Sequence, residues 1–208
     1  MMYVTVQVTP FAQNCSLVWC SETMKGAAVD PGGDLDRITR TAEAKGVTIE
    51  KILLTHGHID HAGEAGILAK SLGVPIEGPH RDDKPWLDQM TDQARMFGVT
   101  FGKRFTPDRW LEDGDTVTFG TIVLSVLHCP GHSAGHVVFF EPSSRVALVG
   151  DVLFQGSIGR TDFPGGDHAT LIRSIRERLL PLGDDVTFIS GHGPNSTFGT
   201  ERRSNPYL

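Results

Sequence analysis

The run His56-Gly-His58-Ile-Asp60-His61 concentrates side chains that bind metal ions. It follows an apolar stretch at 51–54 that reads as a short strand. In an extended loop after that strand, His56, His58 and Asp60 would project to the same side, because successive side chains alternate. His61 breaks this period where the next helix begins, and the turning backbone would aim it at a second ion. The spacing therefore predicts two neighbouring metal sites.

Further ligands must come from other loops, because a catalytic zinc usually takes three protein ligands and a water. Three loops after predicted strands each offer one: His132 in Cys-Pro-Gly-His, Asp151 in Leu-Val-Gly-Asp and His192 in Ile-Ser-Gly-His. The glycine beside each candidate lets the backbone approach an ion without a Cβ clash. A single histidine is more often a hydrogen-bonded core or surface residue, but that interpretation does not explain the whole set. His136 fits a hydrogen-bonding partner of these ligands or a residue that closes its loop.

The elements that must position these residues follow from the apolar pattern. Alternation and β-rich runs predict strands at 4–8, 15–20, 27–29, 51–54, 116–119, 122–127, 137–140, 146–149 and 186–189. Helical spacing predicts helices at 34–45, 62–72, 82–97 and 168–180, the third interrupted early by Pro85. Two similar halves result, each a sheet that needs helices on one face. Their economical packing is an α/β fold with four layers, an αββα sandwich.

Composition narrows the classes of partner and the compartment. The chain has 208 residues, a net charge of −6 and 39% hydrophobic residues, which fits a globular protein and argues against a nucleic-acid partner. No apolar run approaches the roughly 20 residues that cross a bilayer, and the first residues read as a strand rather than a signal peptide. We therefore expect no membrane partner and a cytoplasmic location, where Cys15, Cys20 and Cys129 are buried thiols. The oligomeric state has no signature in the sequence.

The ordered motifs HGHIDH, PGH, GD and GH resemble the signature of metallo-β-lactamase-fold hydrolases over roughly residues 3–208. The resemblance implies that fold in a single domain spanning 1–208. It also implies two divalent metal ions, with Zn²⁺ as first choice and Fe or Mn as alternatives. The nucleophile would be a hydroxide shared by the two ions, oriented by Asp60. The pattern assigns His56, His58 and His132 to the first ion, Asp60, His61 and His192 to the second, and Asp151 to both.

The stretch 150–166 narrows the expected substrate. It resembles the loop after the bridging aspartate in type II glyoxalases and their short bacterial relatives, thioesterases that act on S-D-lactoylglutathione. The resemblance implies a hydrolase of small thioesters, including glutathione-derived ones, with Arg160 as the first candidate for a substrate contact. Asp162 and Pro194 stand where the two-domain glyoxalases present aromatic hydroxyls, and we expect no C-terminal helical glutathione-binding domain in this protein. We therefore expect looser specificity than in those enzymes.

Other activities remain compatible with the same ligands. The segment Gly-Arg-Thr-Asp-Phe also resembles glutathione-persulfide dioxygenases, whose mononuclear iron would use His56, His132 and Asp151. A lactonase or other ester hydrolase would need the same pair of metals. A metallonuclease is disfavoured by the acidic charge. A metal scaffold without turnover is disfavoured because structural sites are normally closed by four protein ligands.

Overall fold

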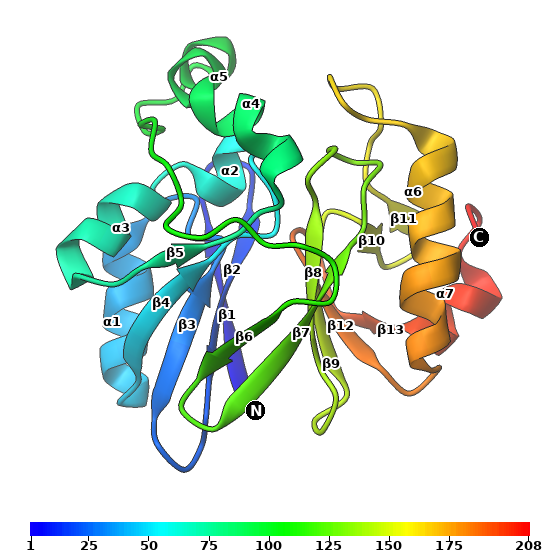
Figure 1. The fold of residues 1–208 in the computed structure, drawn as a ribbon, viewed down its shortest axis with the longest axis horizontal. Coiled ribbons are helices and arrows are strands. Elements are labelled where there is room, and N and C mark those ends of the chain that lie inside the picture. The colour runs from blue at the N-terminus through cyan, green and yellow to red at the C-terminus, as the bar shows by residue number, and fades with distance from the viewer.

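Two β-sheets form the centre of the molecule, and helices cover their outer faces (Figure 1). The computed structural model describes residues 1–208. The first sheet has the order β1-β2-β3-β4-β5, with β1 (Met2–Val8), β2 (Gln13–Trp19), β3 (Lys25–Val29), β4 (Thr48–Leu53) and β5 (Ile76–Glu77). The second has the order β13-β12-β9-β8-β7-β6, with β6 (Thr116–Phe119), β7 (Ile122–His128), β8 (Val137–Glu141), β9 (Val146–Gly150), β12 (Thr187–Ser190) and β13 (Ser196–Thr197). A separate short hairpin joins β10 (Leu153–Phe154) to β11 (Ser157–Ile158).

Three apolar layers hold the sheets and helices together. Between the sheets, Val18 and Leu53 of the first pack with Phe139 and Leu148 of the second. Outside the first sheet, α1 (Leu35–Lys45) and α3 (Ala65–Leu72) bury residues such as Ile38. Outside the second lie α6 (His168–Ser174) and α7 (Phe198–Ser204), and a third cluster joins their apolar side chains to that sheet. The predicted four-layer αββα sandwich is confirmed.

The strand directions explain where polar loops gather. Strands β3, β4 and β5 run parallel, joined by crossovers through α1 and α3. In the second sheet β9 and β12 are parallel as well, with α6 between them in the chain. Parallel neighbours end at the same edge of a sheet, so the loops after them lie together. The residues that follow β3, β4, β9 and β12 therefore meet at one end of the sandwich.

Two predicted helices are divided in the structure. The helix expected at 62–72 is preceded by a separate turn, α2 (Ile59–Ala62), and α3 begins after Gly63 and Glu64. The helix expected at 82–97 is a 3₁₀ turn (Arg81–Asp83) followed by α4 (Lys84–Asp88) and α5 (Met90–Phe97). Pro85 does not interrupt it, because a proline in the first turn of a helix needs no N–H donor there. The break comes at Gln89, between α4 and α5.

The C-terminal half of the prediction was incomplete rather than misplaced. The helix expected at 168–180 is α6 continued by a π-helical turn (Ile175–Leu179) and a 3₁₀ turn (Leu180–Leu182). The two-residue strands and α7 were not predicted, since such short segments carry no measurable period. Cys15, Cys20 and Cys129 are buried free thiols, as expected. No helix combines the length and the apolar character that crossing a membrane would require.

Candidate metal centre

Three imidazoles converge at the end of the sandwich to form a first group of ligands. His56 and His58 follow β4, and His132 follows β7 in the opposite sheet. His58 Nδ1 lies 3.1 Å from His56 Nε2 and 3.0 Å from His132 Nε2. All three rings are buried, with at most 7% of any residue exposed. Three nitrogen atoms at such separations can share one metal ion.

A second group lies beside the first and combines Asp60, His61 and His192. His192 Nε2 lies 3.1 Å from Asp60 Oδ2, and His61 Nε2 lies 3.8 Å from the same oxygen. Asp60 does not project with His56 and His58 from an extended loop, as its alternate position suggested, because the chain has already entered α2. The helical turn sends Asp60 and His61 together toward His192.

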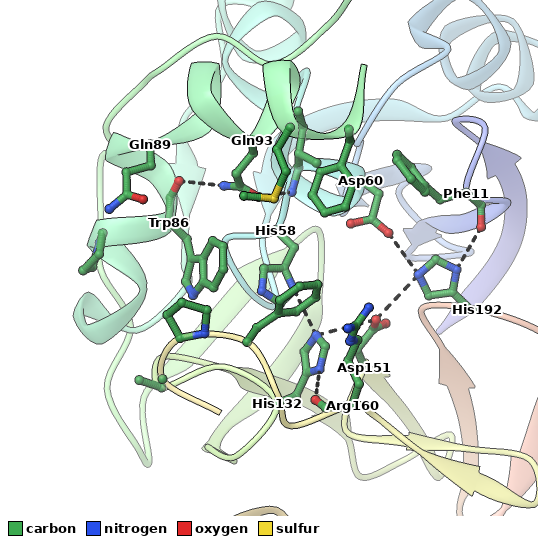
Figure 2. A pocket seen from close by; sticks show the side chains of 18 of the residues that line it. Phe11, His58, Asp60, Trp86, Gln89, Gln93, His132, Asp151, Arg160 and His192 are labelled. Atoms are coloured by element: carbon green, nitrogen blue, oxygen red, sulfur yellow. Dashed lines mark hydrogen bonds and ion pairs between the residues drawn. The ribbon is translucent and has the colours of Figure 1, made fainter. Parts of the chain in front are cut away.

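Asp151 lies between the two groups, and Figure 2 shows it flanked by His132 and His192. Its Oδ1 is 3.2 Å from His61 Nε2, while its Oδ2 is 3.7 Å from His132 Nε2 and 3.6 Å from His192 Nε2. The carboxylate thus reaches ligands of both groups. The structure brings all the candidate ligands together: His56, His58, Asp60, His61, His132, Asp151 and His192.

The unpaired atoms of the centre fit metal ions. His61 Nε2 and Asp151 Oδ1 are buried and lie 3.2 Å apart, but neither has a hydrogen bond of good geometry to any group. A buried polar atom without a partner is costly, and an ion would satisfy both of these. In two of the other histidines, the ring nitrogen that faces away from the centre has a hydrogen-bond partner. His132 Nδ1 donates to the Arg160 carbonyl at 2.8 Å, and His192 Nδ1 donates to the Phe11 carbonyl at 3.2 Å. Such bonds fix the tautomer that leaves Nε2 free for a metal.

The two groups differ in their affinity for protons. Burial lowers the pKa of His56, His58 and His132, to about 3 for His58, with further lowering from neighbouring rings at the first two. Burial alone would also lower the pKa of His61, but the carboxylates of Asp151 and Asp60 raise it well above its usual value. The pKa of His192 is raised as well: burial opposes this, but the hydrogen bond to Asp60 and the charge of Asp151 outweigh it. Without metal, the histidines of the second group therefore bind protons more tightly than those of the first.

The carboxylates of Asp60 and of Asp151, which lies between the groups, are correspondingly ionised. Burial favours the neutral acid at Asp60 and Asp151, but His61 and His192 together hold the pKa of both carboxyls below the usual value. Ionised oxygens beside imidazoles are suitable ligands for a divalent cation. The donor set of this chain therefore fits two such ions.

Asp30 is a functional residue that the sequence analysis missed. It follows β3, is buried, and accepts hydrogen bonds from the Thr55 backbone N–H at 2.8 Å and the Thr55 hydroxyl at 2.6 Å. It also accepts from His61 Nδ1 at 2.9 Å, while the Thr55 hydroxyl lies 3.0 Å from His56 Nδ1. Asp30 thus orients one histidine of each group. Asp30 directly follows a strand and precedes Pro-Gly-Gly, just as Asp151 directly follows a strand. This similarity is the sequence feature that could have identified Asp30.

Other histidines of the chain have structural partners. His136 Nε2 accepts the backbone N–H of Asp151 at 3.1 Å, and its ring stacks on His56 with centroids 4.7 Å apart. It is therefore a hydrogen-bonding partner of the centre. His80 and His128 stack at 4.2 Å away from the centre and bond to Glu112 and to the Ala134 carbonyl.

A pocket of about 960 Å³ opens over both groups. One part of its wall is aromatic and comprises Phe11, Trp86, Phe97, Phe154 and Phe163. The ring centroids of Trp86 and Phe163 lie 4.5 and 5.3 Å from that of His58. Arg160 lines the same pocket, with its guanidinium 4.0 Å from the Phe163 centroid and paired with Asp162 at 2.5 Å. The aromatic wall was not predicted, because its members are far apart in the sequence.

Comparisons with known proteins show the family and agree with this fold. The family model described as the metallo-beta-lactamase superfamily matches residues 8–192. Over 204 residues, 98% of this chain and 96% of the relative, the chain is 47% identical to hydroxyacylglutathione hydrolase GloC of Haemophilus influenzae.

Two solved structures have nearly the same fold. The crystal structure of the BLEG-1 B3 metallo-beta-lactamase superposes with a TM-score of 0.92 at 34% identity, covering 100% of this chain and 99% of its own. The structure of TTHA1623 in a di-iron-bound form superposes with a TM-score of 0.90 at 38% identity, covering 99% of this chain and 100% of its own.

Proposed function

The chain belongs to the metallo-beta-lactamase superfamily, and we propose that it hydrolyses thioesters such as S-D-lactoylglutathione to D-lactate and glutathione. The observation that carries the proposal is the pair of ligand groups joined by Asp151, which together line a pocket of about 960 Å³. The similarity to a hydroxyacylglutathione hydrolase along nearly the whole chain supports the substrate class.

We propose two divalent ions as cofactors, with Zn²⁺ first and Fe or Mn as alternatives; the di-iron form of a similar protein supports iron as a candidate. His56, His58 and His132 would hold one ion, Asp60, His61 and His192 the other, and Asp151 both. When bound, the ions supply the Lewis acidity that activates water and polarises a carbonyl.

The chain's own residues would orient the reactants. Asp60 borders the pocket and is kept ionised by His61 and His192, so its carboxylate can accept a hydrogen bond from the attacking water. A departing thiolate has a pKa of about 8.5 and leaves without a strong general acid. The absence of a dedicated proton donor among these roles is therefore compatible with a thioester substrate.

Arg160 would bind a carboxylate of the substrate. Its guanidinium faces the pocket and already forms a two-pronged pair with the Asp162 carboxylate, at 2.7 Å from Nε and 2.5 Å from the terminal nitrogen. A substrate carboxylate can replace Asp162 in the same geometry, since both are planar acceptors. The glycyl and glutamyl carboxylates of glutathione offer such a group.

The direct test is release of thiol from S-D-lactoylglutathione by protein loaded separately with Zn²⁺, Fe²⁺ or Mn²⁺. We expect equal amounts of glutathione and D-lactate with at least one metal. Oxygen uptake with glutathione persulfide in the absence of thioester cleavage would instead assign the mononuclear-iron dioxygenase. Turnover of a lactone or oxygen ester alone would assign the ester hydrolase.

A further inference from the structure

Asp83 is a buried carboxylate that none of the roles above uses. It ends the 3₁₀ turn Arg81–Asp83 that precedes α4, and it is fully buried. Its Oδ1 accepts the Gly135 backbone N–H at 2.6 Å. Its Oδ2 accepts both the Gly57 backbone N–H and the Ser133 hydroxyl at 2.8 Å. Its partners therefore come from two separate loops.

Those loops carry the first group of metal ligands. Gly57 stands between His56 and His58, and Ser133 directly follows His132. One loop belongs to the first sheet and the other to the second, so Asp83 joins the two sheets where their histidines converge. No hydrogen bond links Asp83 to the second group, whose imidazoles are held by the Asp30 carboxylate and the Phe11 carbonyl.

Close packing keeps this carboxylate in place. A Cβ on Gly57 would lie 2.7 Å from Trp86 Cβ, and a Cβ on Gly135 would lie 2.6 Å from the His80 carbonyl oxygen. Both loops therefore press directly on the segment that carries Asp83. Gln93 of α5 adds a second attachment, accepting the Ile59 N–H at 3.0 Å and donating to the Trp86 carbonyl at 2.8 Å.

We propose that Asp83 is a positioning residue that sets the separation of the loops bearing His58 and His132, and thereby the metal affinity of the first site alone. The inference rests on the proposed metal centre but not on the identity of the substrate. A carboxylate suits this task because all its partners are donors. An asparagine at this position would turn its amide N–H toward at least one of them, leaving that donor unpaired.

The test is Asp83→Asn, with metal affinity measured for each site by competition with a chelator. His192→Ala leaves only the first site complete, and His58→Ala leaves only the second. In the first background, Asp83→Asn is expected to weaken Zn²⁺ binding about 10–100-fold, the range usual for loss of an outer residue that orients metal ligands. In the second background, the affinity is expected to stay unchanged, because Asp83 forms no hydrogen bond to the loops of the second group.

Glu201→Gln is the matched control. Like Asp83, Glu201 is a buried carboxylate that accepts three hydrogen bonds, from the Gly156 N–H, the Ser196 hydroxyl and the Asn205 amide. Unlike Asp83, it lies in α7, away from the metal centre. The Glu201→Gln substitution should lower the melting temperature and leave the metal affinity of both sites unchanged. If Asp83→Asn does not fold, Ser133→Ala removes one partner and should produce a smaller loss confined to the first site.

Equal weakening of both sites by Asp83→Asn, no weakening of the first site, or the same loss from Glu201→Gln would overturn the proposal. Metal affinity is read without substrate. A wild-type protein that binds two ions but cleaves no thioester would therefore refute the proposed function and leave this inference standing.

Discussion

Gly191 offers a sharp test of the centre, because it stands against the bridging carboxylate. A Cβ at this position would overlap Asp151 Oδ1 and lie 2.5 Å from His61 Cε1. Two backbone hydrogen bonds hold Gly191 in place: its N–H donates to the Gly150 carbonyl at 2.8 Å, and its carbonyl accepts from the Asn14 N–H at 2.7 Å. The backbone therefore cannot shift away from these neighbours without breaking them. Gly191→Ala must therefore displace the two ligands.

The size of the effect follows from the distances. Carbon atoms in favourable contact are about 3.5–4.0 Å apart, so the His61 ring would have to move by roughly 1 Å. Metal–ligand distances tolerate only about 0.2 Å. We expect Gly191→Ala to lower metal affinity at least about 100-fold, which corresponds to about 2.7 kcal/mol. Thioester turnover should fall in parallel.

Metal content after dialysis, chelator competition and thiol release would measure the effect, with thermal melting as the test of folding. Gly193→Ala is the control from the same loop. A Cβ there meets nothing within 4 Å, and the change costs only left-handed backbone strain at φ 73°, about 1–2 kcal/mol of stability. The reasoning would be refuted if Gly191→Ala bound two ions with wild-type affinity, or if Gly193→Ala lost metal to the same extent.

Three further outcomes are expected. His58→Ala should abolish thiol release while melting changes little, and unchanged turnover of a metal-loaded variant would contradict the assignment. Arg160→Ala should raise KM for S-D-lactoylglutathione about tenfold with kcat within about twofold; an equal effect on an uncharged thioester would make Arg160 a loop-stabilising residue. Because a metal must displace protons from His61 and His192, whose pKa is raised, the affinity of the second site should fall as pH decreases from about 8 to about 6. The metal affinity of the first site, whose histidines are already neutral, should change much less with pH. Chelator competition in His58→Ala and His192→Ala measures the second and the first site separately. An equal dependence of both affinities on pH would contradict the opposite pKa shifts of the two groups.

The sequence alone predicted the layers and the ligand types. Strands such as β8 and β9 are apolar at successive positions because both faces are covered, and α1 repeats its buried residues Ile38 and Ala42 with helical spacing. Metal ligation by His and Asp is a property of the residue type, so the ordered motifs name the seven residues that the structure brings together around Asp151.

The same reasoning failed where neighbours in space decide the conformation. Nothing local distinguishes Asp60 in an extended loop from Asp60 in α2. Gln93 fastens this turn by accepting the Ile59 N–H from another helix. Across the break at Gln89, Gln93 of α5 donates a hydrogen bond to the Trp86 carbonyl of α4. These contacts are between distant positions, and periodicity contains no information about them.

The run His56-Gly-His58-Ile-Asp60-His61 shows most clearly what the sequence determined and what the tertiary structure decided. The sequence determined which atoms are available for metal ions, because imidazole and carboxylate chemistry does not depend on the fold. The tertiary structure decided how those atoms are grouped, which protons they hold and which residues brace them. Asp30, Asp83 and the aromatic pocket wall acquire their roles only when two sheets bring separate loops within hydrogen-bonding distance.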